Sequence, residues 1–347
     1  MTTHQETLPE ARQRTGRETT LPRLVDGGRF DWIFIALCTW VIIGMAMDAW
    51  AHSHGQTDES FFTPWHAGLY SGFTAAVLFI GATLVVNWRR GYRGWGLVPI
   101  GYPLSMAGLF LFGLGGFADM IWHTLFGIEE NLEAIVSPSH LLLAIALGLI
   151  VTGPVRAAWY RPETRPRSPL PLLLALSFTW NAFAFLTVYI HPFVYMHALG
   201  GTEQVQQLGL AGILLQAIIL SGIVLVAVRR WQMPPGSFTL IFVLNVLVLT
   251  AISDEFRLII PVALAGIATD AMNTRWQPRL HRGWKLRLFA FAVPALVYLG
   301  YFVTIMLTGR VAWVVHLWAG GVVLAGIAGW IGSHLLWLPP IPAAVEP

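Results

Sequence analysis

The sequence predicts an all-α integral membrane protein with about ten transmembrane helices. Of its 347 residues, 56% are hydrophobic and 11% are charged, whereas a soluble domain carries about 25% charged residues. The mean hydropathy of +0.63 agrees with this composition. The apolar residues form long continuous segments, and in hydrocarbon only helices of that length satisfy their own backbone polar groups. The sequence does not show the alternating strands of about ten residues that form a membrane β-barrel.

The predicted elements follow one another along the chain. Residues 1–29 are polar and contain five arginines, which predicts a disordered cytoplasmic tail. Ten apolar segments come next, each near the roughly 20 residues that a bilayer crossing requires. They cover approximately residues 31–51, 64–87, 99–123, 136–158, 168–192, 207–228, 236–253, 258–272, 286–308 and 311–336, of which the eighth is the shortest. Residues 339–347 are predicted to form a second cytoplasmic tail.

The positions of the basic residues predict the orientation in the membrane. Nineteen of the 21 Lys and Arg residues lie in the N-terminal tail or in the even-numbered loops, and the exceptions are Arg257 and Arg310. Because basic residues collect on the cytoplasmic side, we expect both ends in the cytoplasm and the odd-numbered loops outside, in a bacterial plasma membrane. The basic residues are spread between the apolar segments, so they indicate orientation in a lipid bilayer and no nucleic-acid partner.

Histidines collect on the opposite side of the predicted membrane. Eight of the 11 histidines fall in outer loops or at outer helix ends, with acidic residues among them. Ionisable groups near a membrane interior are costly, and their default interpretation is functional. Cys38 is the one cysteine of the chain, so a disulfide or a cysteine-rich metal site is excluded.

Two stretches of the sequence match each other. The first reads Gly44-Met-Ala-Met-Asp48-Ala-Trp-Ala-His52 and continues, after Glu59, with Thr63-Pro64-Trp-His66. The second reads Gly115-Gly-Phe-Ala-Asp119-Met-Ile-Trp-His123 and continues, after Glu133, with Ser137-Pro138-Ser-His140. We therefore divide the chain into a repeated four-helix half, residues 30–158 with copies at about 31–87 and 99–158, and a second helical half, residues 159–338. Polar sites often lie between such membrane repeats.

The spacing within each copy predicts a metal site. Asp and His four residues apart lie one turn apart on one helix face. Thr or Ser followed by Pro is typical of an N-cap and the first helical position, which places the second histidine in the first turn of the returning helix. One carboxylate and two imidazoles are a ligand set for copper, zinc or iron. The predicted ligands are Asp48, His52 and His66 in the first copy and Asp119, His123 and His140 in the second. The alternative is that these residues simply reach water or cap a neighbouring helix.

The segment Asp48-Ala-Trp-Ala-His52 … Phe62-Thr63-Pro64-Trp65-His66 resembles the metal-binding segment of the C subunit of copper membrane monooxygenases, the methane and ammonia monooxygenase group. The family pattern is Asp-x3-His near a helix end, an acidic loop, and Phe-Thr-Pro-x-His at the start of the next helix. The resemblance implies an intramembrane copper near the outer face, with further membrane subunits as partners. It is limited to the metal-site segments, and this chain has longer loops, more helices and a second motif.

Other side chains are predicted as additional ligands or as groups that orient them. They are Glu59, Glu133, His54, His191, His197 and His316. His191 and His197 follow the fifth apolar segment near Met196, a soft side chain that suits Cu(I), although loop histidines without a role are an equal alternative. His316 is expected either to complete a site or to hydrogen-bond a neighbour.

These features predict a polytopic plasma-membrane metalloprotein with outer-face sites, copper being the expected metal and zinc or iron the alternatives. As an enzyme it is expected to be a monooxygenase-like component that uses O2 on a small apolar substrate arriving through the bilayer. One alternative is a copper-binding or copper-transporting protein. Another is a zinc-dependent membrane hydrolase in which Glu59 or Glu133 activates a metal-bound water.

Overall fold

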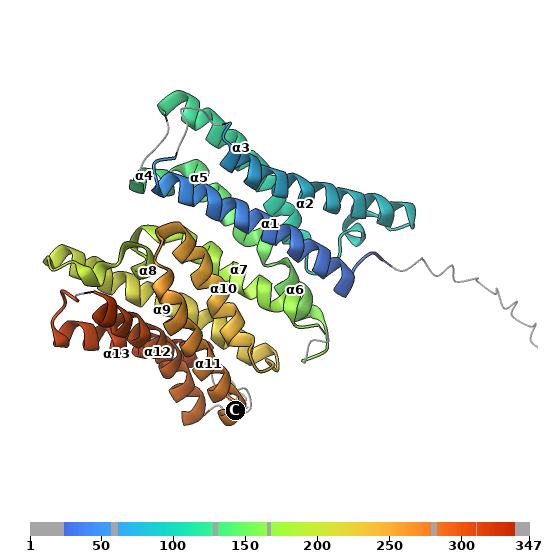
Figure 1. Cartoon of the computed structure of the whole chain (residues 1–347). Coiled ribbons are helices and arrows are strands. Elements are labelled where there is room, and N and C mark those ends of the chain that lie inside the picture. The colour runs from blue at the N-terminus through green and yellow to red at the C-terminus, as the bar shows by residue number, and fades with distance from the viewer. Residues whose placement is uncertain are drawn as a thin grey trace, which may run out of the picture.

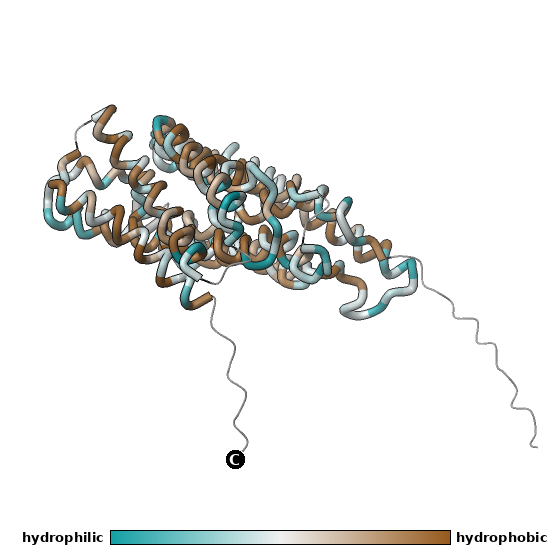
Figure 2. Tube along the Cα trace, turned by 90° about the horizontal axis from the view of Figure 1, so that it is seen from below, coloured by the Kyte–Doolittle hydropathy of each residue, from teal (hydrophilic) through white to brown (hydrophobic). Residues whose placement is uncertain are grey.

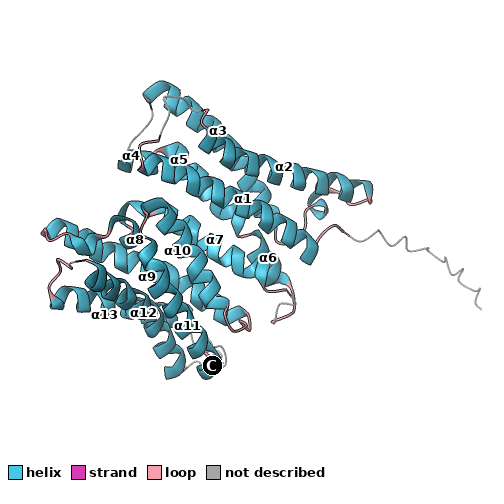
Figure 3. Cartoon of the chain, in the orientation of Figure 1, coloured by secondary structure: helices cyan, strands magenta, loops and turns pink. Residues whose placement is uncertain are grey.

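A computed structural model describes residues 24–56, 62–127, 131–164, 168–278, 283–309 and 311–336, with only the backbone of residues 131, 133 and 134. Every regular element in these ranges is helical (Figure 3). The α-helices are α1 (Gly28–Ser53), α2 (Pro64–Arg89), α3 (Pro103–Phe126), α4 (Asn131–Val136), α5 (Pro138–Val151), α6 (Gly153–Tyr160), α7 (Leu170–Leu186), α8 (Pro192–Tyr195), α9 (Glu203–Arg230), α10 (Ser237–Ser253), α11 (Ile259–Trp276), α12 (Trp284–Thr308) and α13 (Val315–Leu336). Four 3-10 turns connect them, η1 (Gly94–Leu97), η2 (Val188–Ile190), η3 (His197–Leu199) and η4 (Phe256–Leu258).

The apolar segments of the sequence coincide with helices. Eight helices are long and apolar enough to cross a membrane, and α7 and α10 are shorter apolar helices of 17 residues each. The eighth segment, expected to be the shortest, belongs to a 21-residue span, Phe256–Trp276, that includes η4. The chain is therefore an all-α protein with the composition and helix lengths of a membrane protein.

Two of the predicted helices differ from the structure because of proline. The fifth was expected over residues 168–192, but α7 ends at Leu186 and the chain continues through η2 and α8. Proline disfavours helical geometry at the residue before it and lacks an N–H donor, so a continuous helix cannot run through His191, and Pro192 begins α8 with His191 as its N-cap. The fourth predicted helix divides at Thr152 into α5 and α6, with Pro154 near the start of α6.

The repeated half consists of two helical hairpins (Figure 1). Helix α1 packs along α2, and α3 packs along α5. The hairpins contact each other through α2 with α3 and through α1 with α5. This pairing is expected for copies related by an approximate two-fold axis, because such an axis exchanges α1 with α3 and α2 with α5.

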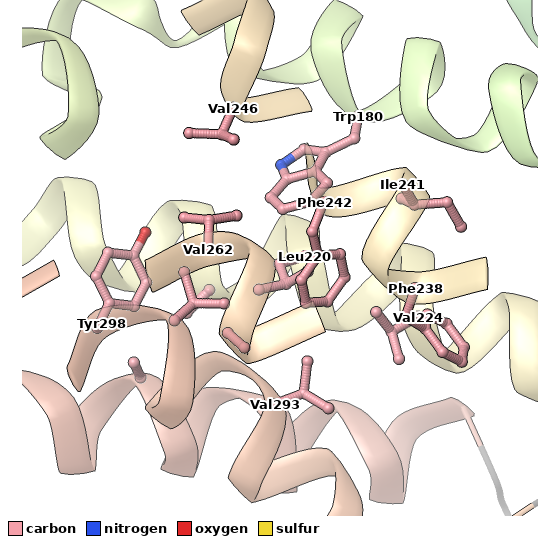
Figure 4. Packing of buried hydrophobic residues seen from close by; sticks show 14 of the residues in the cluster. Trp180, Leu220, Val224, Phe238, Ile241, Phe242, Val246, Val262, Val293 and Tyr298 are labelled. Carbon is pink, nitrogen blue, oxygen red and sulfur yellow. The ribbon is translucent and has the colours of Figure 1, made fainter. Parts of the chain in front are cut away.

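Buried apolar side chains form two clusters. One cluster draws on α1, α2, α3, α5, α6 and part of α7. The other occupies the rest of the helical bundle, where Trp180 of α7 packs on Phe242 of α10 (Figure 4). Helix α7 contributes to both clusters since its buried residues extend around its whole circumference. Along the helices hydrophobic residues predominate, and hydrophilic residues collect mainly in the connecting turns (Figure 2).

Polar contacts join the two halves at both ends of the bundle. At the end where α1 begins, the buried carboxylate of Asp31 accepts a hydrogen bond of 2.7 Å from Tyr102 and pairs with Arg161 at 2.6 Å. At the opposite end, Ser53 donates to the carbonyl of Ile252, 2.9 Å away. Beside it, His54 pairs with Asp254 at 2.7 Å. The contacts of Ser53 and His54 hold the end of α1 against the end of α10, next to the predicted metal ligands.

Candidate metal centre

The first group of predicted ligands lies where α1 ends and α2 begins. Asp48 and His52 are one helical turn apart near the end of α1, and His66 lies in the first turn of α2. The Thr63 hydroxyl accepts the backbone N–H of His66 at 3.0 Å, and Pro64 is the first residue of α2. The predicted N-cap is therefore confirmed, and it fixes His66 at the helix start. The His66 Nε2 atom lies 3.4 Å from the Asp48 carboxylate.

The second group repeats this arrangement between α3 and α5. Asp119 and His123 lie near the end of α3, and His140 lies in the first turn of α5 behind the N-cap Ser137. The Nε2 atoms of His123 and His140 lie 3.4 and 3.5 Å from opposite oxygens of the Asp119 carboxylate. Only 1% of Asp119 is exposed. The second group is thus more enclosed than the first, in which Asp48 and His52 are half-buried.

These separations are compatible with ligands around one ion. In each group, one ligand atom from every side chain lies within 4.8 Å of the other two. Two atoms that bind a metal at about 2.0–2.2 Å with a tetrahedral angle are about 3.4 Å apart. Charge-assisted hydrogen bonds are shorter, about 2.7–2.9 Å. The nitrogen–oxygen distances of 3.4 and 3.5 Å therefore fit a shared metal ion better than direct hydrogen bonds.

One oxygen of the buried carboxylate in the second group lacks a hydrogen bond. Asp119 Oδ1 is enclosed and has no hydrogen bond. A buried charge without a partner is costly, and buried carboxylates are ordinarily paired or bind metals. A cation bound between Asp119, His123 and His140 would interact with this oxygen directly. The donor set of one carboxylate and two imidazoles suits a transition metal and leaves a coordination position open.

Neighbouring groups orient the imidazoles of the second group. The Nδ1 atom of His140 lies 2.8 Å from the Ser137 hydroxyl, and Nδ1 of His123 lies 3.4 Å from the carbonyl of Gly127. A hydrogen on Nδ1 that is donated to an oxygen leaves the lone pair on Nε2. In both residues it is Nε2 that faces Asp119. Ser137 thus caps α5 and also directs a ligand, a role that the sequence did not predict.

Close helix contacts align the ligands within each hairpin. Gly44, one turn before Asp48, lies against the backbone of Leu69 in α2. The equivalent Gly115 in α3 lies against Leu143 in α5. These are the same positions in the two copies of the sequence repeat. Because a glycine lets two helix axes approach closely, the carboxylate on one helix reaches the histidine on the other.

The two groups lie near each other at one end of the bundle. His52 of the first group is within electrostatic range of His66 in its own group and of His123 and His140 in the second. The rings of His123 and His140 are 5.7 Å apart between centroids. The hairpin pairing described above therefore places two sets of three ligands side by side.

The other predicted residues lie elsewhere. Glu59 is outside the described ranges, and Glu133 is in α4 with its side chain not described. His54 is exposed and pairs with Asp254, so the structure assigns it to the contact between the halves. His316 is exposed at the start of α13.

His191 and His197 are buried in the connection between α7 and α9, and they are not among the metal-compatible groups of the described chain. The Nδ1 atom of His191 accepts the backbone N–H of Phe193 at 3.1 Å. Burial, with a smaller effect of the nearby His197 charge, lowers the pKa of His191 to about 3. His191 is therefore a neutral helix cap in this connection.

The apolar helical fold and the two Asp/His groups are compatible with a membrane metalloprotein. No family model, curated protein or solved structure matches this chain.

Proposed function

We propose that this protein is a membrane metalloprotein that binds one transition-metal ion at each Asp/His group, with copper as the resident metal. The observation that carries the proposal is the arrangement of His123 and His140 about the buried Asp119, at separations that suit a common ion. The same arrangement of residue types at the first group supports a second ion. The choice of copper rests on the resemblance of the Asp-x3-His and Thr-Pro-x-His segment to the copper membrane monooxygenases.

The proposed activity is monooxygenase-like chemistry on a small apolar substrate. Copper held by Asp119, His123 and His140 would supply an open coordination position and a centre for electron transfer to O2. The residues of this chain hold the carboxylate between two imidazoles, orient His140 through Ser137, and bury Asp119 away from water. Enclosure by apolar helices strengthens the electrostatic interactions of the group.

Metal analysis of the purified protein tests this proposal. We expect two copper ions per chain, and one in each of the double variants Asp48→Ala/His52→Ala and Asp119→Ala/His123→Ala. The matched control is His316→Ala, which removes an exposed histidine outside both groups and should leave two ions. Unchanged metal content in both double variants would reject the sites. Stoichiometric zinc without copper would reject the monooxygenase-like chemistry and favour the zinc-dependent hydrolase.

Oxygen uptake by the copper-loaded protein tests the activity separately. With a quinol as reductant, uptake should require copper and should fall strongly in Asp119→Ala/His123→Ala. Copper that binds at both groups without any reductant-dependent oxygen uptake would favour the copper-handling alternative.

A further inference from the structure

Tyr70 extends from the first hairpin to the second. It lies one turn after His66 in α2, and its ring meets the His66 ring edge to face at 6.0 Å between centroids. The opposite side of the phenol lies on α3. A Cβ atom at Gly116 would be 2.7 Å from both Cε1 and the hydroxyl oxygen of Tyr70. Only glycine at position 116 therefore lets the phenol occupy this place.

This contact places the hydroxyl about one helical turn from Asp119 of the second metal group. Gly116 is three residues before Asp119, which is about one helical turn. The carboxylates of Asp48 and Asp119 are both within electrostatic range of Tyr70. Phe112 packs against the Tyr70 ring at 6.2 Å and supports it from the same helix as Gly116. A single phenol thus lies between the two groups of ligands.

The repeat does not duplicate this phenol. The position one turn after His140 is Ala144, and the position that matches Gly116 in the first copy is Met45. Both Ala144 and Met45 are buried. At the contact between α2 and α3, the large side chain of Tyr70 packs against Gly116. The equivalent positions in α5 and α1 hold Ala144 and Met45. The two metal groups match in their ligands and differ in this hydroxyl.

We propose that Tyr70 is a positioning residue for the second metal group, and that its hydroxyl donates a hydrogen bond to a small oxygen- or nitrogen-donor ligand on the metal held by Asp119, His123 and His140. This inference rests on the proposed function, because it requires a metal at that group. The first hairpin thereby contributes the Tyr70 hydroxyl to the metal site of the second hairpin. Small anions that accept a hydrogen bond while binding a metal are the class of ligand that Tyr70 would favour.

Azide binding to Cu2+ tests the role of Tyr70. The experiment uses the full chain carrying Asp48→Ala/His52→Ala, so that the second group alone holds copper. Azide titration is followed by its absorption band with Cu2+, and the copper signal is recorded by electron paramagnetic resonance. Loss of a hydrogen bond to a charged ligand weakens binding by about tenfold or more. We therefore expect Tyr70→Phe to retain one Cu2+ per chain and to bind azide about tenfold more weakly, with an altered copper signal.

Two glycine variants separate the hydroxyl from general effects on α3. Gly116→Ala keeps the phenol but displaces it from α3, and it should weaken azide binding as Tyr70→Phe does. Gly113→Ala is the matched control, because its Cβ atom would make an ordinary contact of 3.4 Å with Phe73, and it should leave azide affinity unchanged.

Unchanged azide affinity and an unchanged copper signal in Tyr70→Phe would overturn the proposal for Tyr70 and leave the proposed function intact. Equal weakening in Gly113→Ala and Gly116→Ala would also overturn it, since the effect would then follow from any added methyl group on α3. A parent variant that binds no Cu2+ would instead contradict the proposed function, and the role of Tyr70 with it.

Discussion

Gly44 of α1 and Leu69 of α2 touch through their backbones: a Cβ atom at Gly44 would lie 2.6 Å from the Leu69 Cα atom. Backbone atoms cannot move aside as the end of a flexible side chain can. The helices of the first hairpin are therefore held at a separation that only glycine allows. Asp48 is one turn after Gly44 in α1, and His66 is one turn before Leu69 in α2. The contact between Gly44 and Leu69 therefore sets the distance between the metal ligands Asp48 and His66.

Gly44→Ala should separate α1 from α2 and weaken the first metal group selectively. Overpacking of this kind costs about 1–3 kcal/mol of unfolding free energy. We expect a lower thermal midpoint in detergent and loss of the copper bound at Asp48, His52 and His66, with the second ion retained. Gly148→Ala in α5 is the control, since its Cβ atom would meet nothing within 4 Å. Equal metal loss in both variants would contradict this account.

Gly115→Ala should be milder than Gly44→Ala, although the two glycines are equivalent in the repeat. A Cβ atom at Gly115 would lie 3.1 Å from side-chain carbons of Leu143 and 3.4 Å from its backbone nitrogen. The leucine side chain can rotate to relieve the closer contact. Copper titration of both variants measures the difference, and a greater loss of copper in Gly115→Ala than in Gly44→Ala would show that side-chain relaxation does not occur.

Ser137→Ala should weaken the second metal group beyond the loss of a helix cap. Removal of an N-cap costs about 1 kcal/mol, and removal of a group that orients a ligand lowers metal affinity about 10- to 100-fold. The Thr202→Ala variant removes the N-cap of α9, which is in the other half of the chain. We expect similar losses of thermal stability in both variants and weaker copper binding in Ser137→Ala alone, measured by competition with a chelator.

The stability of the protein should fall on acidification partly because of His191, which lies outside the membrane-spanning helices. A histidine in the unfolded chain has a pKa of about 6.5, whereas the pKa of His191 in the folded protein is about 3. Between these values the unfolded chain binds a proton that the folded protein does not, so stability decreases as the pH falls. His191→Asn keeps a side-chain acceptor for Phe193 and removes the titration. Its thermal midpoint should fall less between pH 7 and pH 4.5 than that of the parent, and an equal decrease would contradict the assignment.

The sequence is sufficient to predict the parts of the site that depend on local spacing. Asp48 with His52, and Asp119 with His123, share a helix face because of the four-residue interval. Proline after Thr63 and Ser137 indicates the helix starts at which His66 and His140 lie. Hydropathy likewise predicts the positions of the apolar helices, because length and composition decide which segments suit a bilayer.

Contacts between distant segments required the structure. Asp254 is 200 residues from His54, and its backbone adopts a left-handed conformation with φ of 58° next to the end of α10. The structure pairs Asp254 with His54 and Glu255 with Arg257, and the pairing of Asp254 joins segments that sequence spacing does not relate. Tyr70 was not predicted either, because its role depends on packing between α2 and α3. The fifth helix was predicted too long because hydropathy alone continues past Leu186.

Pulsed electron paramagnetic resonance of the Cu2+-loaded Asp48→Ala/His52→Ala protein tests the central claim most directly. The signal from the remote imidazole nitrogens counts the histidines bound to the ion. We expect two imidazoles in this protein and one after the further substitution His140→Ala, with the copper retained more weakly. A Cu2+ signal without coupled imidazole nitrogens, or one that His140→Ala leaves unchanged, would contradict the assignment of Asp119, His123 and His140 as a metal site.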